Sequence, residues 1–171
     1  MLSNKIEKAL NEQVTKEAYS SNLYLAMASW SEANGYAGIA AWLYSQAEEE
    51  KRHMLKFIRY INERGGHAII SEMKQPPKDH GTINAMFESV LKHEEYISAS
   101  INDIVALTIA EKDFTTQNWI QWFVNEQIEE ESQVKLILDK IKLVGDTNMY
   151  IFDRDIVDLR KDSTDTAADA P

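Results

Sequence analysis

The sequence predicts an all-α protein, a bundle of four long helices with one long crossover loop and a short fifth helix near the C-terminus. Three observations support this fold class. Gly and Pro are scarce, with 6 and 3 in 171 residues, which disfavours an all-β chain of many turns. The turn-forming residues are clustered, and the segments between the clusters are rich in Ala, Leu, Glu, Lys and Ile.

The first two helices are expected at about residues 4–33 and 36–64, where the chain has no internal Pro. Asn34-Gly35 ends the first helix and Gly65-Gly66 ends the second, because Gly readily adopts the left-handed conformation that follows a helix. About two residues separate the two helices, so they must be antiparallel.

The third and fourth helices are expected at about residues 82–111 and 115–143. Thr82 is a candidate N-cap for the third helix, and Thr115 or Thr116 for the fourth, because a threonine hydroxyl can accept a hydrogen bond from the first helical turn. The short break between these helices makes them antiparallel as well.

The connection at residues 65–81 is long enough to cross the whole bundle. A helix of about 28 residues is roughly 42 Å long, whereas about 17 extended residues reach roughly 55 Å. Pro76-Pro77 favours an extended form, so the third helix can start parallel to the second. A weaker fifth helix is expected from Asp146, as N-cap, to Arg160.

Length and cysteine content limit the organisation and the chemistry. A chain of 171 residues has room for one domain, which we place at residues 1–161, with 162–171 as a disordered tail. The absence of Cys excludes a disulfide scaffold, a thiolate metal site and a cysteine nucleophile. A bound metal must therefore be held by carboxylate, imidazole or amide groups.

The charge excludes two classes of partner. The 18 Lys and Arg against 28 Asp and Glu give a net charge of −10, which repels nucleic acid and anionic membranes and attracts cations. The sequence contains no apolar run long enough for a transmembrane helix, and the amphipathic residues 1–13 do not form a secretory signal. A cytoplasmic protein without nucleic-acid or membrane partners is expected.

Each long helix carries an acid or amide within its apolar stripe. Residues seven positions apart lie on nearly the same helix face. By this rule five polar side chains share the core-facing register near mid-helix: Glu17, Glu50, Glu94, Gln127 and Glu130. On any one helix the stripe could simply reach the bundle edge at that point, but the coincidence on four helices favours a buried polar site.

The residue types of this site indicate a metal. Glu50 and His53, three residues apart, place a carboxylate beside an imidazole. Burying several carboxylates without cations costs many kcal/mol, and carboxylates with imidazole suit iron or manganese in the di-iron pattern of helical bundles. Gln127 and Glu130 stand where a second Glu-x-x-His would be, so one pair of helices carries more strong metal ligands than the other.

The chain resembles the prokaryotic-type non-haem ferritins of the ferritin-like di-iron superfamily over at least residues 1–160. The single long crossover agrees with the ferritin-like four-helix bundle. The motifs that carry the resemblance are Glu17 with Tyr24, Glu49-Glu50-x-x-His53, Glu94, Trp122, and Glu126-Gln127-x-Glu129-Glu130.

The resemblance implies the following ligand roles. The first iron would be bound by Glu17, Glu50 and His53, with Glu50 as the bridge to the second. The second iron would be bound by Glu94 and Glu130, with Gln127 as a ligand or hydrogen-bond partner. A third iron would be bound by Glu49, Glu126 and Glu129. Tyr24 and Trp122 match aromatic residues of the family that can donate electrons during oxygen reduction.

The residues taken alone give a plainer interpretation of some of these positions. Glu49 and Glu129 would be solvated charges about 100° from their neighbours in the site, and Trp122 would serve packing. Tyr24 would be a core aromatic whose hydroxyl needs a partner, which a site carboxylate could supply. His67, His80 and His93 would lie on the surface or in loops.

The function that the resemblance implies is iron storage and detoxification. A ferroxidase site would oxidise Fe²⁺ with O₂ or peroxide, and a homo-oligomeric shell of 24 subunits would hold the ferric mineral. Haem is not expected, because Lys51 occupies the place of the Met that haem-bearing bacterioferritins carry. Four large aromatics are predicted to contact neighbouring subunits: Trp30, Tyr36, Trp42 and Tyr44.

Three alternatives stay open. A di-iron oxidase or peroxidase of rubrerythrin type would share the bundle, although such chains typically carry two Glu-x-x-His motifs and a Cys-rich domain. A DNA-protecting mini-ferritin would bind its metals between subunits. A structural bundle without metal is the third, and an anaerobic iron titration would separate it from the others.

Overall fold

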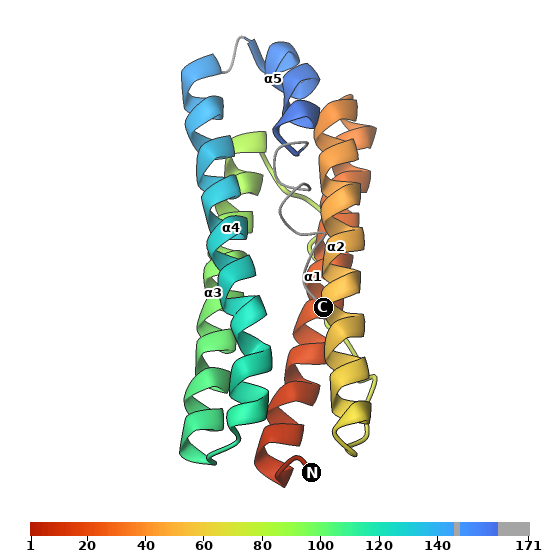
Figure 1. The fold of residues 1–171 in the computed structure, drawn as a ribbon. Helices are drawn as coiled ribbons and strands as arrows, with labels where there is room; N and C mark the ends of the chain where they lie inside the picture. The colour runs from red at the N-terminus through yellow and green to blue at the C-terminus, as the bar shows by residue number, and fades with distance from the viewer. Residues whose placement is uncertain (146–147, 161–171) are drawn as a thin grey trace.

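The computed structural model describes residues 1–145 and 148–160, and it confirms the predicted all-α bundle. Two antiparallel pairs, α1 with α2 and α3 with α4, lie side by side, and α5 lies across one end of the bundle (Figure 1). The elements are α1 (Asn4–Ala33), α2 (Ala37–Glu63), α3 (Ile83–Ala110), α4 (Phe114–Val144), α5 (Met149–Asp155) and the 3₁₀ helix η2 (Ile156–Arg160).

The helix ends follow the expected signals with one correction. Thr82 caps α3, since its Oγ1 accepts a hydrogen bond from the Ala85 amide at 3.1 Å, and Gly65 after α2 has φ +78°. The prediction of Thr115 or Thr116 as the α4 N-cap was wrong. Asp113 is the cap, because its carboxylate accepts hydrogen bonds from both the amide and the hydroxyl of Thr116, at 3.0 and 2.7 Å.

The fifth helix is shorter than predicted. It begins at Met149 rather than at Asp146, which lies outside the described residues, as does the predicted tail at 162–171. From Ile156 the chain continues as the 3₁₀ helix η2 instead of α-helix. The amide of Ile39 at the start of α2 donates to Oδ1 of Asp153 at 2.9 Å, which fixes α5 against the end of α2.

The crossover spans the length of the bundle, as the loop-length argument predicted, and it contacts α1 near both of its ends. Near one end the side chain of Asn11 accepts a hydrogen bond from the Ile69 amide at 2.6 Å and donates to the His67 carbonyl at 3.1 Å. Near the other end the rings of His80 and Trp30 meet edge-on, with centroids 5.8 Å apart. The loop therefore spans the bundle and starts α3 parallel to α2 (Figure 1).

The apolar core is divided into two clusters. One lies toward α5 and includes Tyr24, Leu43 and Phe87, and the other lies toward the α3–α4 turn and includes Leu10 and Phe57. In sequence, the buried acids of every long helix fall between the residues of the two clusters. The two apolar clusters thus enclose a polar layer at mid-bundle, as the seven-residue register predicted.

The prediction that Trp42 contacts another subunit was wrong. Trp42 is 1% exposed, because it packs edge-on against Phe87 within the cluster near α5. Trp30 and Tyr36 are partly buried against the same cluster, and only Tyr44 is exposed.

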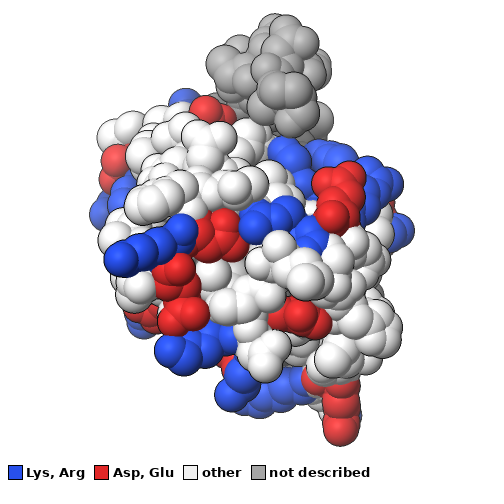
Figure 2. All heavy atoms as spheres, turned by 60° about the horizontal axis from the view of Figure 1, so that its bottom comes forward, with Lys and Arg blue, Asp and Glu red and all other residues white. Residues whose placement is uncertain are grey.

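Charged residues of both signs are interspersed on the end of the bundle seen in Figure 2, with no large region of one sign on that face. Among the described helices, none has an apolar stretch that could cross a membrane.

Candidate metal centre

Side chains from all four long helices meet in the polar layer. α1 supplies Glu17, α2 supplies Glu50 and His53, α3 supplies Glu94, and α4 supplies Glu130. Each is 5% exposed or less. Ionisable side chains are almost never buried to this degree unless they are paired or bind a metal.

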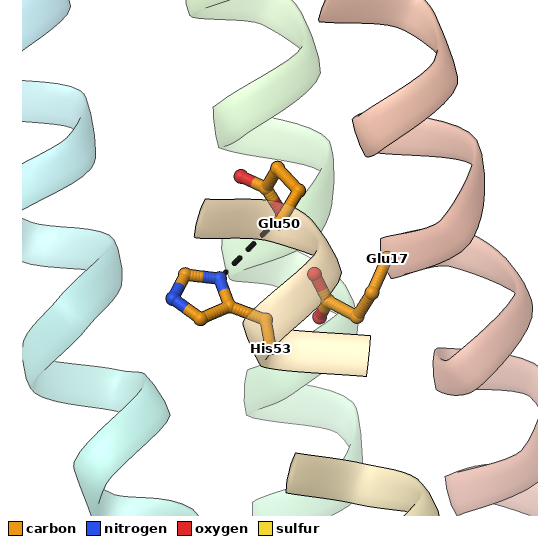
Figure 3. A group of neighbouring side chains, drawn as sticks. All are labelled: Glu17, Glu50 and His53. Atoms are coloured by element: carbon orange, nitrogen blue, oxygen red, sulfur yellow. Dashed lines mark ion pairs between the residues drawn. The ribbon is translucent and has the colours of Figure 1, made fainter. Parts of the chain in front are cut away.

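Three of these side chains form a compact group. Glu17, Glu50 and His53 each offer a ligand atom, and these atoms all lie within 4.8 Å of one another. The Glu17 carboxylate extends from α1 toward the α2 pair, in which Nδ1 of His53 lies 3.5 Å from Oε2 of Glu50 (Figure 3). The structure thus brings together the three residues that the sequence assigned to one iron.

Glu94 is held by two neutral donors. The Tyr24 hydroxyl donates to its Oε1, and Nε2 of Gln127 donates to its Oε2 at 3.2 Å. The same Gln127 amide lies 3.3 Å from Oγ of Ser98. Gln127 is thus a hydrogen-bond partner of Glu94 in the metal-free protein, and its role as a metal ligand stays a prediction. The hydrogen-bond partner of Tyr24 lies across the bundle on α3.

Two further glutamines donate to two of the other site carboxylates, those of Glu17 and Glu130. Nε2 of Gln13 donates to Oε1 of Glu17, and Nε2 of Gln46 donates to Oε2 of Glu130, both at 2.7 Å. Both glutamines are fully buried. Sequence reasoning missed them, although each lies four residues before a site glutamate on its own helix, a spacing that puts two side chains on one face.

Burial controls the protonation of the site. It raises the pKa of Glu17, Glu50 and Glu130 well above the usual range, and repulsion between neighbouring carboxylates raises the pKa further. Burial also raises the pKa of Glu94, and the donors Tyr24 and Gln127 partly offset that rise. A cluster of this kind favours either bound protons or bound cations.

The donor set fits iron. Carboxylates are hard ligands and imidazole is a common ligand of iron. No permanent donor among the described residues reaches the buried Oε2 of Glu17. A cation among these carboxylates would use that oxygen and remove the repulsion that raises their pKa values.

A second candidate group lies on the other side of His53. Ligand atoms of Glu49, His53 and Glu126 lie within 4.8 Å of one another, and Nε2 of His53 is 3.8 Å from Oε1 of Glu126. They line a pocket of about 400 Å³ together with Arg52, Lys56, Arg59 and Trp122. Glu129 is exposed and lies outside this group.

Trp122 packs beside the centre. Its ring meets the His53 ring edge-on, with centroids 5.4 Å apart, and the Lys56 ammonium lies 3.3 Å from the ring centroid. These contacts agree with the packing role inferred from the residues alone, and they also fix one face of the His53 imidazole.

The three histidines outside the site differ in exposure. His67 is exposed and His80 is a half-buried loop residue. His93 is partly buried at the surface of α3, where its Nε2 lies 2.7 Å from the buried Ser20 hydroxyl. Burial lowers the pKa of His93 to about 4.

Comparison with known proteins gives consistent relatives. A family model described as a ferritin-like domain matches residues 7–144. The chain is 42% identical over 161 residues to a bacterial non-heme ferritin of Campylobacter jejuni, covering 93% of this chain and 96% of that protein. It is 34% identical over 161 residues to the bacterial non-heme ferritin of Escherichia coli O157:H7, with 93% and 98% covered.

A solved structure gives the same match in three dimensions. The open pore ferritin of the hyperthermophilic archaeon Archaeoglobus fulgidus superposes with a TM-score of 0.89 at 35% identity, covering 91% of this chain and 96% of that chain.

Proposed function

The chain belongs to the ferritin family, among the bacterial non-haem ferritins, and from this premise we propose that it oxidises Fe²⁺ and stores the ferric product. The observation that carries the proposal is the buried group of Glu17, Glu50 and His53 between two apolar clusters. These three side chains are 1%, 2% and 4% exposed, so the group is almost completely removed from water.

Two Fe²⁺ ions are the substrate of the proposed site. Glu17, Glu50 and His53 bind one, Glu94 and Glu130 bind the other, and Glu50 serves both. The iron supplies the electrons that reduce O₂ or peroxide. The carboxylates favour Fe³⁺ over Fe²⁺ because hard anionic oxygens stabilise the higher charge.

The hydrogen-bond donors of the site keep the carboxylates in place for the metal. Tyr24, Gln13, Gln46 and Gln127 are neutral, so they orient the carboxylate oxygens without contributing a charge that would compete with a cation. We propose that Gln127 acts in this way and that the second metal, with fewer strong ligands, leaves more readily.

We further propose that a third iron binds at Glu49 and Glu126, beside His53, and that it also uses the exposed Glu129, whose charge acts on Glu126. Because His53 contacts both groups, it couples this position to the first iron. An electron-donating role for Tyr24 and Trp122 is part of the same proposal.

Storage requires a cavity that a single bundle does not have. We propose a shell of 24 copies of this chain without haem, in which residues 1–161 form the ferritin-like domain. The exposed apolar side chains of the crossover, which include Ile69, Ile70 and Met73, support burial against another subunit.

An anaerobic Fe²⁺ titration followed by admission of air tests the proposal. We expect two Fe²⁺ per subunit to bind tightly before a weaker third, a rise in ultraviolet absorbance when O₂ enters, and iron retained in a particle of 24-subunit mass after gel filtration. Oxidation without retained iron would instead support a di-iron oxidase or peroxidase of rubrerythrin type. The absence of both oxidation and metal binding would reject the site.

A further inference from the structure

A hydrogen-bonded chain connects the partly exposed Lys16 to the buried carboxylate of Glu17. Nζ of Lys16 donates to Oγ of Ser100 at 2.5 Å. Oγ of Ser100 donates to Oε1 of Gln13 at 2.6 Å, and Nε2 of Gln13 donates to Oε1 of Glu17 at 2.7 Å. The chain crosses from α1 to α3 and back to α1.

The direction of every bond in this chain is determined by its outer end. An ammonium group can only donate, so the Ser100 hydroxyl must accept from Lys16 and is free to donate its own hydrogen. The Gln13 carbonyl accepts that hydrogen, which turns the Gln13 amide nitrogen toward Glu17. A reversed amide would turn the Gln13 carbonyl toward Glu17, and an ionised carboxylate has no hydrogen to donate to it, so that bond would be lost.

This orientation distinguishes the two oxygens of Glu17. Oε1 accepts from Gln13, whereas no permanent donor among the described residues reaches Oε2. In the metal-free site the neighbouring Glu50 carboxyl shares a hydrogen bond with Glu17, which requires a proton on one of the two carboxyls. Gln13 is 0% exposed and Glu17 is 1% exposed, so water does not easily substitute for either bond. Oε2 is therefore the oxygen left available for a cation.

We propose that Gln13 is a positioning residue of the metal centre, oriented from Lys16 through Ser100, and that it makes Glu17 a ligand through Oε2 alone. This inference rests on the proposed metal-binding function. Hydrogen-bond partners of metal ligands typically change metal affinity by about 10–100-fold when they are removed.

Co²⁺ binding to the metal-free assembled protein tests the proposal without iron oxidation, because the visible spectrum of Co²⁺ reports its ligand geometry. The variants are Gln13→Leu, Ser100→Ala and Ser100→Thr, which keeps the hydroxyl. Ser31→Ala is the matched control, since Ser31 is a buried α1 serine whose hydroxyl donates to the Met86 sulfur, away from the site.

We expect Gln13→Leu to weaken Co²⁺ binding by about tenfold or more and to change the visible spectrum. Ser100→Ala should cause a smaller change in the same direction, which Ser100→Thr restores. Ser31→Ala should leave the affinity and the spectrum unchanged.

Wild-type affinity and spectrum in Gln13→Leu would overturn the inference and leave the proposed function intact. Equal losses in Gln13→Leu and Ser31→Ala would also overturn it, because they indicate a general effect on packing. If Gln13→Leu does not fold, an unchanged Ser100→Ala overturns the inference. Failure of the proposed function is a separate result, namely a wild-type protein whose Co²⁺ binding is absent or insensitive to Glu50→Ala.

Discussion

The Tyr24 hydroxyl donates a hydrogen bond to Oε1 of Glu94 across the bundle, from α1 to α3. The bond lies at the boundary between the polar layer and the apolar cluster near α5, to which the Tyr24 ring belongs. Tyr24 therefore connects the packing of the core to the position of a candidate iron ligand.

The first prediction concerns the loss of this bond. The Tyr24 hydroxyl lowers the pKa of Glu94, in opposition to burial. In Tyr24→Phe the pKa of Glu94 should rise, so protons compete better with metal and the pH of half-saturation with Co²⁺ should move upward. At fixed pH the affinity should fall about tenfold, in line with a hydrogen bond to a charged group.

Tyr60→Phe is the control for this change, because Tyr60 is a buried tyrosine whose hydroxyl donates to Thr116 at 2.9 Å, away from the site. It should leave the pH of half-saturation unchanged. An identical pH profile in Tyr24→Phe would show that Glu94 does not need this donor.

The second prediction ranks the carboxylates of the site. Glu50 is 2% exposed and adjoins both Glu17 and His53, whereas Glu129 is exposed. Glu50→Ala should abolish the fast oxidation of the first two Fe²⁺ per subunit, and Glu129→Ala should change only later turnovers. Stopped-flow absorbance after mixing with O₂ measures both, and equal fast phases in the two variants would contradict the assignment.

The third prediction is a stability profile for the metal-free protein. Burial raises the pKa of Glu17, Glu50 and Glu130 above the ordinary glutamate pKa of 4.5, which applies to the unfolded chain. Between pH 4.5 and the raised pKa values, the folded chain therefore binds more protons than the unfolded chain. The free energy of unfolding should therefore fall as the pH rises through that window. The contribution of these three protonated carboxyls to the free energy of unfolding is fully present only below about pH 4.5.

Saturating Co²⁺ should reverse this slope, because the metal replaces the protons and binds more tightly as the carboxyls ionise. Calorimetric unfolding between pH 5 and 8, with and without Co²⁺, checks both slopes. Glu129→Gln, at an exposed position, should keep the wild-type profile. A metal-free stability that increases with pH across the window would count against the buried cluster.

The fourth prediction concerns assembly. Ile70 in the crossover is 67% exposed, and Ile69 beside it is 52% exposed. If subunits meet over this loop, Ile70→Asp should yield particles smaller than the wild-type shell, as measured by light scattering, because a carboxylate would be buried in the interface. Ser71→Asp, at an exposed polar position in the same loop, should alter assembly less.

Helical periodicity was sufficient to predict the four helices and the depth of the acids in them. Glu17, Glu50, Glu94 and Glu130 lie in one layer because the seven-residue register puts each on the buried face of its helix. The α4 cap was harder to predict, since the preference for Asp113 depends also on Arg64, the C-cap residue of α2, whose Nη2 lies 3.3 Å from the Asp113 carboxylate.

The details that the sequence did not reveal depend on contacts between helices. Trp42 is buried because Phe87 of α3 lies against its ring, and His93 is partly buried because Ser20 of α1 faces it. The spacing of Gln13 and Gln46 puts each on the face of a site glutamate, but the oxygen that accepts each bond follows only from the rotation of the packed helices.

The last prediction compares the same substitution at two site residues in the metal-free protein. In Glu17→Gln the new carbonyl can still accept from Gln13, and the new NH₂ takes the place of Oε2, which no permanent donor of the described residues reaches. The new NH₂ can donate to the neighbouring Glu50 carboxylate, which shares a hydrogen bond with Glu17 in the metal-free protein. Removing one buried charge from the cluster should raise the free energy of unfolding at pH 8 by at least about 1 kcal/mol.

Glu94→Gln should have the opposite effect. Both Glu94 oxygens accept hydrogen bonds, from Tyr24 and from Gln127. If the new carbonyl keeps the bond from Gln127, the new NH₂ faces the Tyr24 hydroxyl, which can accept from it only by turning its own hydrogen away from residue 94, so that the hydroxyl loses its acceptor. Gln127 could reverse its own amide only by losing its bonds to Ser98 and to the Glu94 carbonyl. The unsatisfied donor should lower the free energy of unfolding by about 1–3 kcal/mol. Denaturant unfolding of both variants, with a chelator present, measures the direction in which each substitution changes the free energy of unfolding. A change in the same direction for both variants would mean that hydrogen bonding does not distinguish these two carboxylates.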